Sequence, residues 1–488
     1  MVEEEQKTMK EEEHGKSGYW KDGKKQAVGF LNLTRTIVKA LPGFPGELPF
    51  KLETGYVEVG EKKDVVLFYY FVESERNPTD DPLLIWIAGG PGCSTLRSFF
   101  YQIGPLTIEY PDTSKEIPDL HLNPYSWTKL ANVIFLDAPT SGFSYAKSPE
   151  TYKNSDTLSA KYTYQFLSKW LEKHSKFISN PLYITGLSYS GITIPLIVQE
   201  IFNGNEAGNE PRMNIAGYII GNPLTDRNID FNSKIPYAHQ MALLSDEIYE
   251  STKGNCNGEY VNVNASNKLC QRDLQKVDEC LENVNLYHIL EPICTSDTTT
   301  RSLLQKKFGS STNKYPVPLP RAAKLKGQQW CRDNTYLYTD VWANIQSVRK
   351  ALNIREGTIG KWIRCNDDHY VIGKNDTVNY AYDVSSTLDN HRNFTQKNCR
   401  ALIISGDHDM AFSHLGTKRW IRDLHLNVDR TWAPWFVKQQ VAGYTESFSH
   451  DDFTLTFATV KGGGHAAQES KPEECLAMVH RWFDHNPL

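Results

Sequence analysis

The most informative stretch of the chain is PLYITGLSYSG, residues 181–191. A short apolar run over residues 181–185 ends in a glycine-bounded turn that carries Ser188, and a helical pattern over residues 192–201 follows. A strand, a tight turn with a serine and then a helix make up a nucleophile elbow. A serine between glycines is more often an ordinary turn, so this motif needs partners elsewhere in the chain.

Other short apolar runs end in the same kind of Gly- or Pro-containing turn. They cover residues 82–88, 133–139, 216–223, 400–407 and 457–465. Such runs predict strands buried on both faces of a parallel sheet, and the amphipathic pattern over residues 156–174 predicts a helix between two of them. Two β-rich runs, TGYVEV and VVLFYYFV, predict a hairpin. The expected fold is α/β, with both faces of a mostly parallel central sheet covered.

Two segments depart from this pattern. Residues 1–26 are charged throughout, so we expect them to be disordered, and they lack the apolar core of a signal peptide. Residues from about 224 to 340 hold a cluster of cysteines and few strand signals. We interpret them as a helical, disulfide-linked lid inserted into a single domain over residues 27–488. Its polar stretch around residues 296–327 predicts an exposed loop open to proteolysis.

The overall charge excludes several classes of partner. A net charge of −5 offers no electrostatic case for binding nucleic acid or an anionic membrane surface. No run approaches the ~18 apolar residues that a membrane-spanning helix needs. The chain is therefore expected to be soluble and globular, without nucleic acid or membrane partners.

The cysteines indicate an oxidising compartment. Cys256, Cys270, Cys280 and Cys294 are spaced too widely for a structural zinc site and favour local disulfides, so we predict no metal. Four glycosylation sequons agree with this, although a chain of this length holds about as many by chance. They lie at Asn32, Asn264, Asn375 and Asn393.

Groups that could serve Ser188 follow other predicted strands. A serine nucleophile needs a base, and the base needs an orienting acid. His465 ends the run FATVKGGGH and Asp407 lies in ALIISGDHD, with Asp409 as the alternative acid. Backbone N–H groups of Tyr189 and of Gly90, in IWIAGGPGCS, are the expected oxyanion-binding donors.

These segments together resemble the serine carboxypeptidase-like family. The similarity covers about residues 41–482 and rests on LPGFPGELPF, GGPGCS, GFSYA, GLSYSG, GYIIGNPLTD, SGDHDM, VAGYTESF and VKGGGHAAQE. It implies an α/β-hydrolase with a lid, a triad of Ser188, Asp407 and His465, and no cofactor. It also implies a disulfide between Cys93 and Cys331, and we expect Cys256–Cys270 and Cys280–Cys294 in the lid.

The resemblance separates two activities within the family. The peptidases hold the free carboxylate of their substrate with an Asn and two Glu side chains. The matching positions are Ala88, beside Gly89 in the pocket, Gln102 and Leu187. A buried carboxylate without those partners would cost several kcal/mol, so carboxypeptidase activity is not expected.

The other branch comprises plant acyltransferases, which move an acyl group from a 1-O-β-glucose ester to an alcohol or amine. GYIIGNPLTD and WAPWFVKQQVAGYTE resemble this branch, and we expect this activity in the vacuole or outside the cell. The chain departs from it at Ala88, at Leu187, in the shortened loop PTSGFSY and in the missing proline of GGGHAAQES. The alternatives are a serine esterase, a hydroxynitrile-lyase-like relative and a catalytically silent scaffold member. The resemblance implies a monomer. This monomer is either intact, cleaved into two disulfide-linked chains, or associated with a paralogue of the same family.

Overall fold

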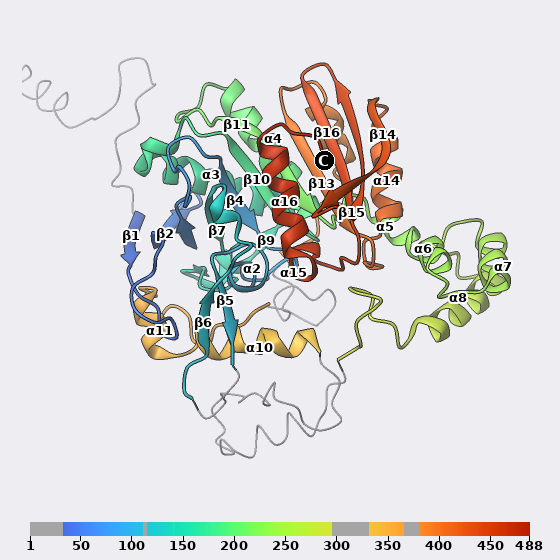
Figure 1. Ribbon diagram of the computed structural model, residues 1–488, viewed down its shortest axis with the longest axis horizontal. Helices are drawn as coiled ribbons and strands as arrows, with labels where there is room; N and C mark the ends of the chain where they lie inside the picture. The colour runs from blue at the N-terminus through green and yellow to red at the C-terminus, as the bar shows by residue number, and fades with distance from the viewer. Residues whose placement is uncertain (1–32, 111–114, 140, 295–330, 366–379) are drawn as a thin grey trace, which may run out of the picture.

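One large twisted sheet organises the molecule (Figure 1). The computed structural model describes residues 33–110, 115–139, 141–294, 331–365 and 380–488. The segment over residues 1–26 and the proteolysis loop around 296–327 lie outside these ranges. The strands of the sheet, in spatial order, are β1 (Leu33–Val38), β2 (Leu52–Val59), β3 (Val65–Val72), β7 (Asn132–Leu136), β4 (Leu83–Ile87), β10 (Leu182–Leu187), β11 (Ile215–Gly221), β13 (Arg400–Gly406), β16 (Phe453–Val460), β15 (Gln440–His450) and β14 (Asn427–Val437), and the short β8 (Tyr145–Ala146) pairs with β3.

The middle of this sheet is parallel, and its two margins are antiparallel. Strands β7, β4, β10, β11, β13 and β16 run in one direction, whereas β1, β2 and β3 on one side and β15 and β14 on the other alternate. The predicted parallel strands are confirmed, and so is the hairpin of β2 and β3. All residues of β4, β7 and β10 are buried, which explains their unbroken apolar sequences.

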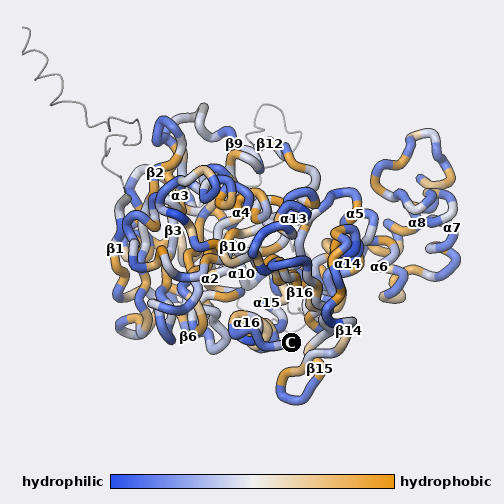
Figure 2. Tube along the Cα trace, turned by 90° about the horizontal axis from the view of Figure 1, so that it is seen from above, coloured by the Kyte–Doolittle hydropathy of each residue, from blue (hydrophilic) through white to orange (hydrophobic). Residues whose placement is uncertain are grey.

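Helices cover both faces of the sheet (Figures 1 and 2). One core contains side chains of α3 (Asp156–Lys173), α4 (Ser190–Glu206), α13 (Leu388–Phe394) and α14 (His414–Arg422). The other contains side chains of α2 (Leu96–Tyr101), α10 (Arg332–Ala343), α11 (Gln346–Ala351) and α16 (Pro472–Phe483), which follows α15 (Ala467–Ser470). Alternate residues of β3 feed the two cores: Val66, Phe68 and Tyr70 lie on one side, and their sequence neighbours lie on the other.

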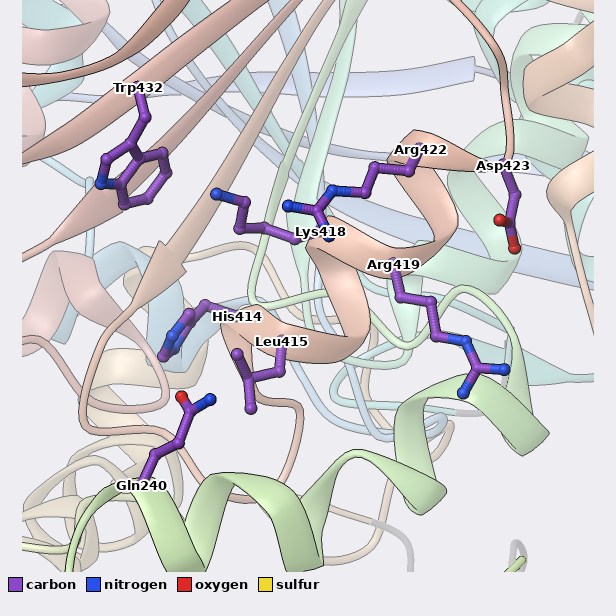
Figure 3. A pocket seen from close by; sticks show the side chains of 8 residues that line it. All are labelled: Gln240, His414, Leu415, Lys418, Arg419, Arg422, Asp423 and Trp432. Atoms are coloured by element: carbon purple, nitrogen blue, oxygen red, sulfur yellow. The ribbon is translucent and has the colours of Figure 1, made fainter. Parts of the chain in front are cut away.

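The sequence did not predict the long hairpin of β14 and β15. Eight consecutive residues of β14 are exposed, so neither alternation nor an apolar run marks it as a strand. Beside this hairpin, side chains of α6 (Lys234–Gln240), α14 and β14 surround a hollow of about 570 Å³, with Lys418 pointing toward Trp432 (Figure 3). The hollow lies apart from Ser188 and carries none of the predicted site residues.

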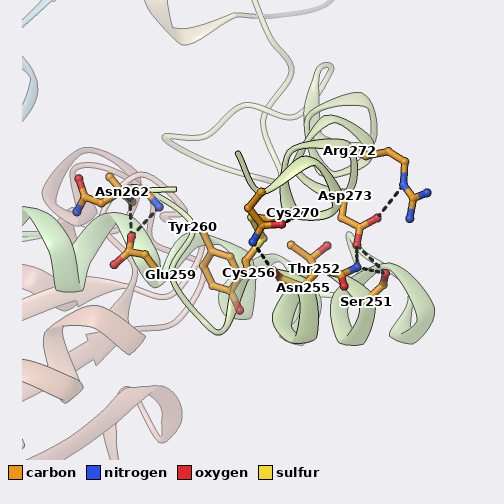
Figure 4. Close-up of a disulfide and its surroundings, with 12 residues drawn as sticks. Ser251, Thr252, Asn255, Cys256, Glu259, Tyr260, Asn262, Cys270, Arg272 and Asp273 are labelled. Atoms are coloured by element: carbon orange, nitrogen blue, oxygen red, sulfur yellow. Dashed lines mark hydrogen bonds and ion pairs between the residues drawn. A yellow bond between two sulfur atoms is a disulfide. The ribbon is translucent and has the colours of Figure 1, made fainter. Parts of the chain in front are cut away.

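The predicted lid region is helical where it is described. It contains α5 (Arg227–Asn232), α6, α7 (Asp246–Cys256) and α8 (Lys268–Leu281), and both views show α7 and α8 projecting away from the sheet (Figures 1 and 2). A disulfide between Cys256 and Cys270 joins these two helices, as predicted (Figure 4). The carboxylate of Asp273 on α8 accepts a hydrogen bond from Ser251 on α7, at 2.6 Å, and ties them further.

Two predicted disulfides are wrong. Cys93 pairs with Cys365 instead of Cys331, and Cys294 pairs with Cys331 instead of Cys280. Cys280 is exposed and unpaired among the described residues. The first pairing had followed the family resemblance, and the second was one of three possible connectivities of the four lid cysteines. Neither could show where distant segments meet, and Cys93 and Cys365 are 272 residues apart. Three disulfides nevertheless agree with an oxidising, secretory environment.

Smaller elements complete the described chain. The short strands are β5 (Leu106–Glu109), β6 (Asp119–Leu122), β9 (Asn154–Ser155) and β12 (Tyr380–Ala381), and three 3₁₀ turns cover Trp127–Lys129, Pro149–Tyr152 and Ser175–Phe177. Among the described helices, none combines the length and the apolar composition that crossing a membrane requires.

Candidate active site

Ser188 stands on a strained turn between β10 and α4. Its φ angle is +64°, in the left-handed region that a non-glycine residue adopts only where its surroundings enforce it. The Ser188 N–H donates to the carbonyl of Gly221 at 2.8 Å, and its carbonyl accepts the N–H of Leu224 at 3.0 Å. A Cβ on Gly186 or Gly191 would lie 2.3 Å from a backbone oxygen, so both flanking positions require glycine. The elbow predicted from the sequence is present.

His465 is held by a fully buried aspartate. Its Nδ1 lies 2.7 Å from Oδ2 of Asp409, whose side chain is 0% exposed. The same carboxylate accepts the side-chain N–H of Asn222 at 2.8 Å and the backbone N–H of Ala411 at 2.8 Å. These contacts fix the imidazole and leave its Nε2 as the nitrogen available to a nucleophile.

The sequence-based choice of Asp407 as the acid is therefore wrong, and the alternative, Asp409, occupies that place. Asp407 accepts the N–H of Gly462 at 2.7 Å and contacts Nδ1 of His408 at 2.6 Å. Its own N–H still donates to Val460, at the end of β16, so the chain has not yet turned away from the sheet at this residue. Two residues later it has turned, and Asp409 reaches the base.

The Gly-rich loop after β4 lies directly against the serine. A Cβ on Gly89 would lie 2.6 Å from Cβ of Ser188 and 3.1 Å from its Oγ, so a larger residue would collide with the nucleophile. Gly90 has a φ of +126°, which favours glycine. Gly90 and Tyr189 line the same cavity as Ser188, which places the two expected oxyanion donors beside it.

Asp137 and a disulfide hold this loop in place. The carboxylate of Asp137, just after β7, accepts the hydroxyl of Ser94 at 2.8 Å and the N–H of Thr95 at 2.9 Å. Burial raises the pKa of Asp137 to about 6, and these hydrogen bonds oppose that shift. The Cys93–Cys365 disulfide ties the loop to a second segment, whose Arg364 carbonyl accepts the Ser94 N–H at 2.8 Å.

Ser188 and His465 open into one cavity of about 380 Å³. All the pocket positions singled out from the sequence line it, namely Ala88, Gly89, Gln102 and Leu187. Asp407 does not line it, and Asp409 lies behind His465. The insertion also contributes to the wall through Tyr287, His288 and Glu291, residues that no motif pointed to.

Charged groups in the cavity wall are largely paired with one another. Nε2 of Gln102 donates to Oε1 of Glu469 at 2.7 Å, and Arg97 forms an ion pair with the same oxygen at 3.0 Å. Tyr336 also donates to Glu469. Arg332 forms a two-pronged ion pair with Glu291. Except for Gln102, which the sequence had singled out, sequence reasoning missed these residues because they lie far apart in the chain, on α2, α10, α15 and in the insertion.

Two of the predicted glycosylation sites can be placed. Asn264 and Asn393 are exposed, and Asn32 and Asn375 lie outside the described residues. Within the described ranges, no group of three or more His, Cys, Asp or Glu side chains is arranged to hold a metal ion.

Comparisons with known proteins agree with this architecture. The profile of the serine carboxypeptidase family matches residues 42–485. Serine carboxypeptidase-like 1 of Arabidopsis thaliana is 44% identical over 454 residues, which is 93% of this chain and 93% of that protein. Serine carboxypeptidase-like 19 of the same plant is 42% identical over 463 residues, covering 93% of this chain and 95% of the relative.

A solved structure shows the same fold. A prohormone-processing carboxypeptidase from Saccharomyces cerevisiae superposes with a TM-score of 0.68 over 89% of this chain and 91% of its own, at 17% identity. The mostly parallel sheet, the serine elbow after β10 and the His465–Asp409 pair beside it are arranged as in an α/β-hydrolase. On the strength of the family match and the close plant relatives, this chain belongs to the serine carboxypeptidase family.

Proposed function

We propose that this protein is an acyltransferase that takes an acyl group from a 1-O-β-acylglucose and passes it to an alcohol or amine through an acyl-enzyme on Ser188. The observation that carries the proposal is the state of the three positions where peptidase relatives bind a carboxylate. Ala88 and Leu187 offer apolar side chains, and the amide N–H of Gln102 already donates to Glu469. Two of the arginines in the wall, Arg97 and Arg332, are paired with Glu469 and Glu291.

The proposed reaction uses the groups around the cavity in two half-reactions. Ser188 Oγ attacks the ester carbonyl while its proton passes to Nε2 of His465, and Asp409 stabilises the imidazolium. The N–H groups of Gly90 and Tyr189 bind the oxyanion. The glucose oxygen leaves with the proton from His465, and the acyl group stays on Ser188.

The second half-reaction reverses these roles. His465 removes the proton of the acceptor hydroxyl or amine, which attacks the acyl-enzyme, and Ser188 recovers its proton from the imidazole. Water attacking in place of the acceptor would give the free acid, the outcome of an esterase. The vacuole or the extracellular space is the proposed site of action, in agreement with the three disulfides.

The test is to expose the protein to mixed acylglucoses and follow its intact mass, then to add hydroxyl and amine acceptors, both neutral and acidic. We expect an acyl adduct on Ser188 that acceptors discharge, and no adduct on Ser188→Ala. A Ser188→Ala variant that transfers as well as the parent would overturn the mechanism. Release of free acid alone would make the protein an esterase. A parent that neither acylates nor reacts with a fluorophosphonate would be a silent scaffold.

A further inference from the structure

A short segment of the insertion, residues 286–289, is bonded to the turn that carries the acid. The carbonyl oxygen of Leu286 accepts the N–H groups of the two residues that follow Asp409, at 2.9 and 3.0 Å. The N–H of Ile289 donates to the carbonyl of His408 at 3.0 Å. The acid turn is thus joined by backbone hydrogen bonds on both sides of Asp409 to a segment outside the sheet.

The same segment contacts the turn that carries the base. The carbonyl of Tyr287 accepts the N–H of His465 at 2.7 Å. The ring of Tyr287 lies 5.3 Å from the imidazole, centroid to centroid, and Phe412 lies 5.5 Å from it. The ring of His288 packs against Gly464, where a Cβ would come within 2.5 Å of it. One four-residue stretch therefore contacts both halves of the Asp409–His465 pair.

Tyr287 is not held in its position by packing into a hydrophobic core. Its side chain is 58% exposed and lines the cavity, although exposing a large aromatic ring gains little stability. The His465 side chain beside it is only 9% exposed. A ring beside the imidazole covers part of it from water, and the hydrogen bond between His465 and Asp409 is stronger where water is excluded.

We infer that Tyr287 is a positioning residue for the general base, and that the insertion, through residues 286–289, forms part of the acid–base machinery. This inference rests on the function proposed above, in which His465 is the base for Ser188. Tyr287 acts in two ways: its carbonyl fixes the backbone of His465, and its ring, together with that of Phe412, confines the imidazole. The hydroxyl of Tyr287 has no part in either role.

The experiment measures the rate at which a fluorophosphonate labels Ser188 as a function of pH, together with thermal unfolding of each variant. We expect Tyr287→Ala to label about tenfold more slowly, because a loosened imidazole spends less time aligned with Ser188. We also expect the midpoint of its pH profile to fall, because water that reaches the imidazole weakens its interaction with the Asp409 carboxylate. Tyr287→Phe keeps the ring and should restore the rate and the midpoint.

Leu290→Ala is the matched control, since this neighbouring side chain is 68% exposed and does not line the cavity. It should label as the parent does. If Tyr287→Ala does not fold, Tyr287→Leu replaces it. A folded variant with the rate and pH midpoint of the parent would overturn the inference and leave the proposed function standing. A parent that does not label would instead overturn the proposed function.

Discussion

At the scale of single residues, the carboxylate of Asp409 is satisfied from several directions. It is fully buried and accepts hydrogen bonds from His465, from Asn222 and from the backbone of Ala411 and Phe412. Asn222 follows β11 with a φ of +45°, a conformation that asparagine tolerates better than most residues. Four neighbouring strands each lead to one polar residue of the site: β10 to Ser188, β11 to Asn222, β13 to Asp409 and β16 to His465.

Replacing this carboxylate tests its role. Asp409→Asn should lower the rate of fluorophosphonate labelling of Ser188 by about 10³-fold or more, because an amide neither stabilises the imidazolium nor enforces the right tautomer. Asp407→Asn makes the same chemical change two residues earlier and is the control. Because Asp407 contacts Gly462 and His408 and not His465, its variant should lose less than about tenfold. Equal losses in the two variants would contradict the assignment.

The sequence brought Ser188 and His465 to the same cavity but chose the wrong aspartate beside His465, for a local reason. Strand-end placement marks Ser188 and His465 because each follows a run of buried apolar residues. In SGDHD both aspartates satisfy the same pattern. Which of them meets the base depends on the residue at which the chain leaves the sheet, and that path is set by contacts of the 406–411 turn with β16 and with the insertion.

At the scale of elements, the Gly-rich loop after β4 depends on a side chain that follows β7, the neighbouring strand in the sheet. Asp137 follows β7 and accepts hydrogen bonds from Ser94, Thr95 and Phe143, so it joins two loops beside the site. A Cβ on Gly142 would lie 2.0 Å from this carboxylate, which explains the glycine in the shortened loop PTSGFSY. Gly142 makes room for the carboxylate that organises both loops.

Burial gives Asp137 a defined effect on pH-dependent stability. Its pKa rises from 3.8 to about 6, so between these pH values the folded protein holds a proton that the unfolded chain releases. The proton on Asp137 therefore adds about 3 kcal/mol to the free energy of unfolding below about pH 4. This contribution is lost as the pH rises through about 6. Asp137→Asn removes this titration. Urea unfolding of parent and variant at both ends of this range should show a parent-minus-variant difference that shrinks as the pH rises. A constant difference would contradict the prediction.

The sequence patterns predicted strands that are buried and missed strands that are exposed. The strands β4, β7 and β10 are buried at every residue, and their apolar runs predicted them to within three residues at either end. The exposed β14 carries no such signal. Its partner β15 pairs with the predicted β16. The two strands that the sequence did not predict therefore extend a sheet whose central strands it did predict.

At the scale of the whole molecule, two disulfides span residues 295–330. Cys93 and Cys294 precede that stretch, and their partners Cys365 and Cys331 follow it. Ser188 lies before the stretch, whereas Asp409 and His465 lie after it. A backbone cut within 295–330 would separate Ser188 from Asp409 and His465 in sequence, whereas the two disulfides would keep the pieces covalently joined.

Limited proteolysis tests this arrangement. A cut in that stretch should give one band on a non-reducing gel and two on a reducing gel, and the cut protein should still label at Ser188. The double variant Cys294→Ser with Cys331→Ser is the control, because Cys93–Cys365 alone should still link the two pieces. Separation of the pieces without reductant would contradict the pairing.

The order of strands along the chain has a consequence for biosynthesis. Ser188 and the oxyanion loop are translated well before β16, and the base arrives only at His465, near the end of the chain. If His465 is the base, as proposed, Ser188 becomes a nucleophile only when β16, the last parallel strand in chain order, docks against β13. A chain that still lacks β16 would then not acylate itself during synthesis.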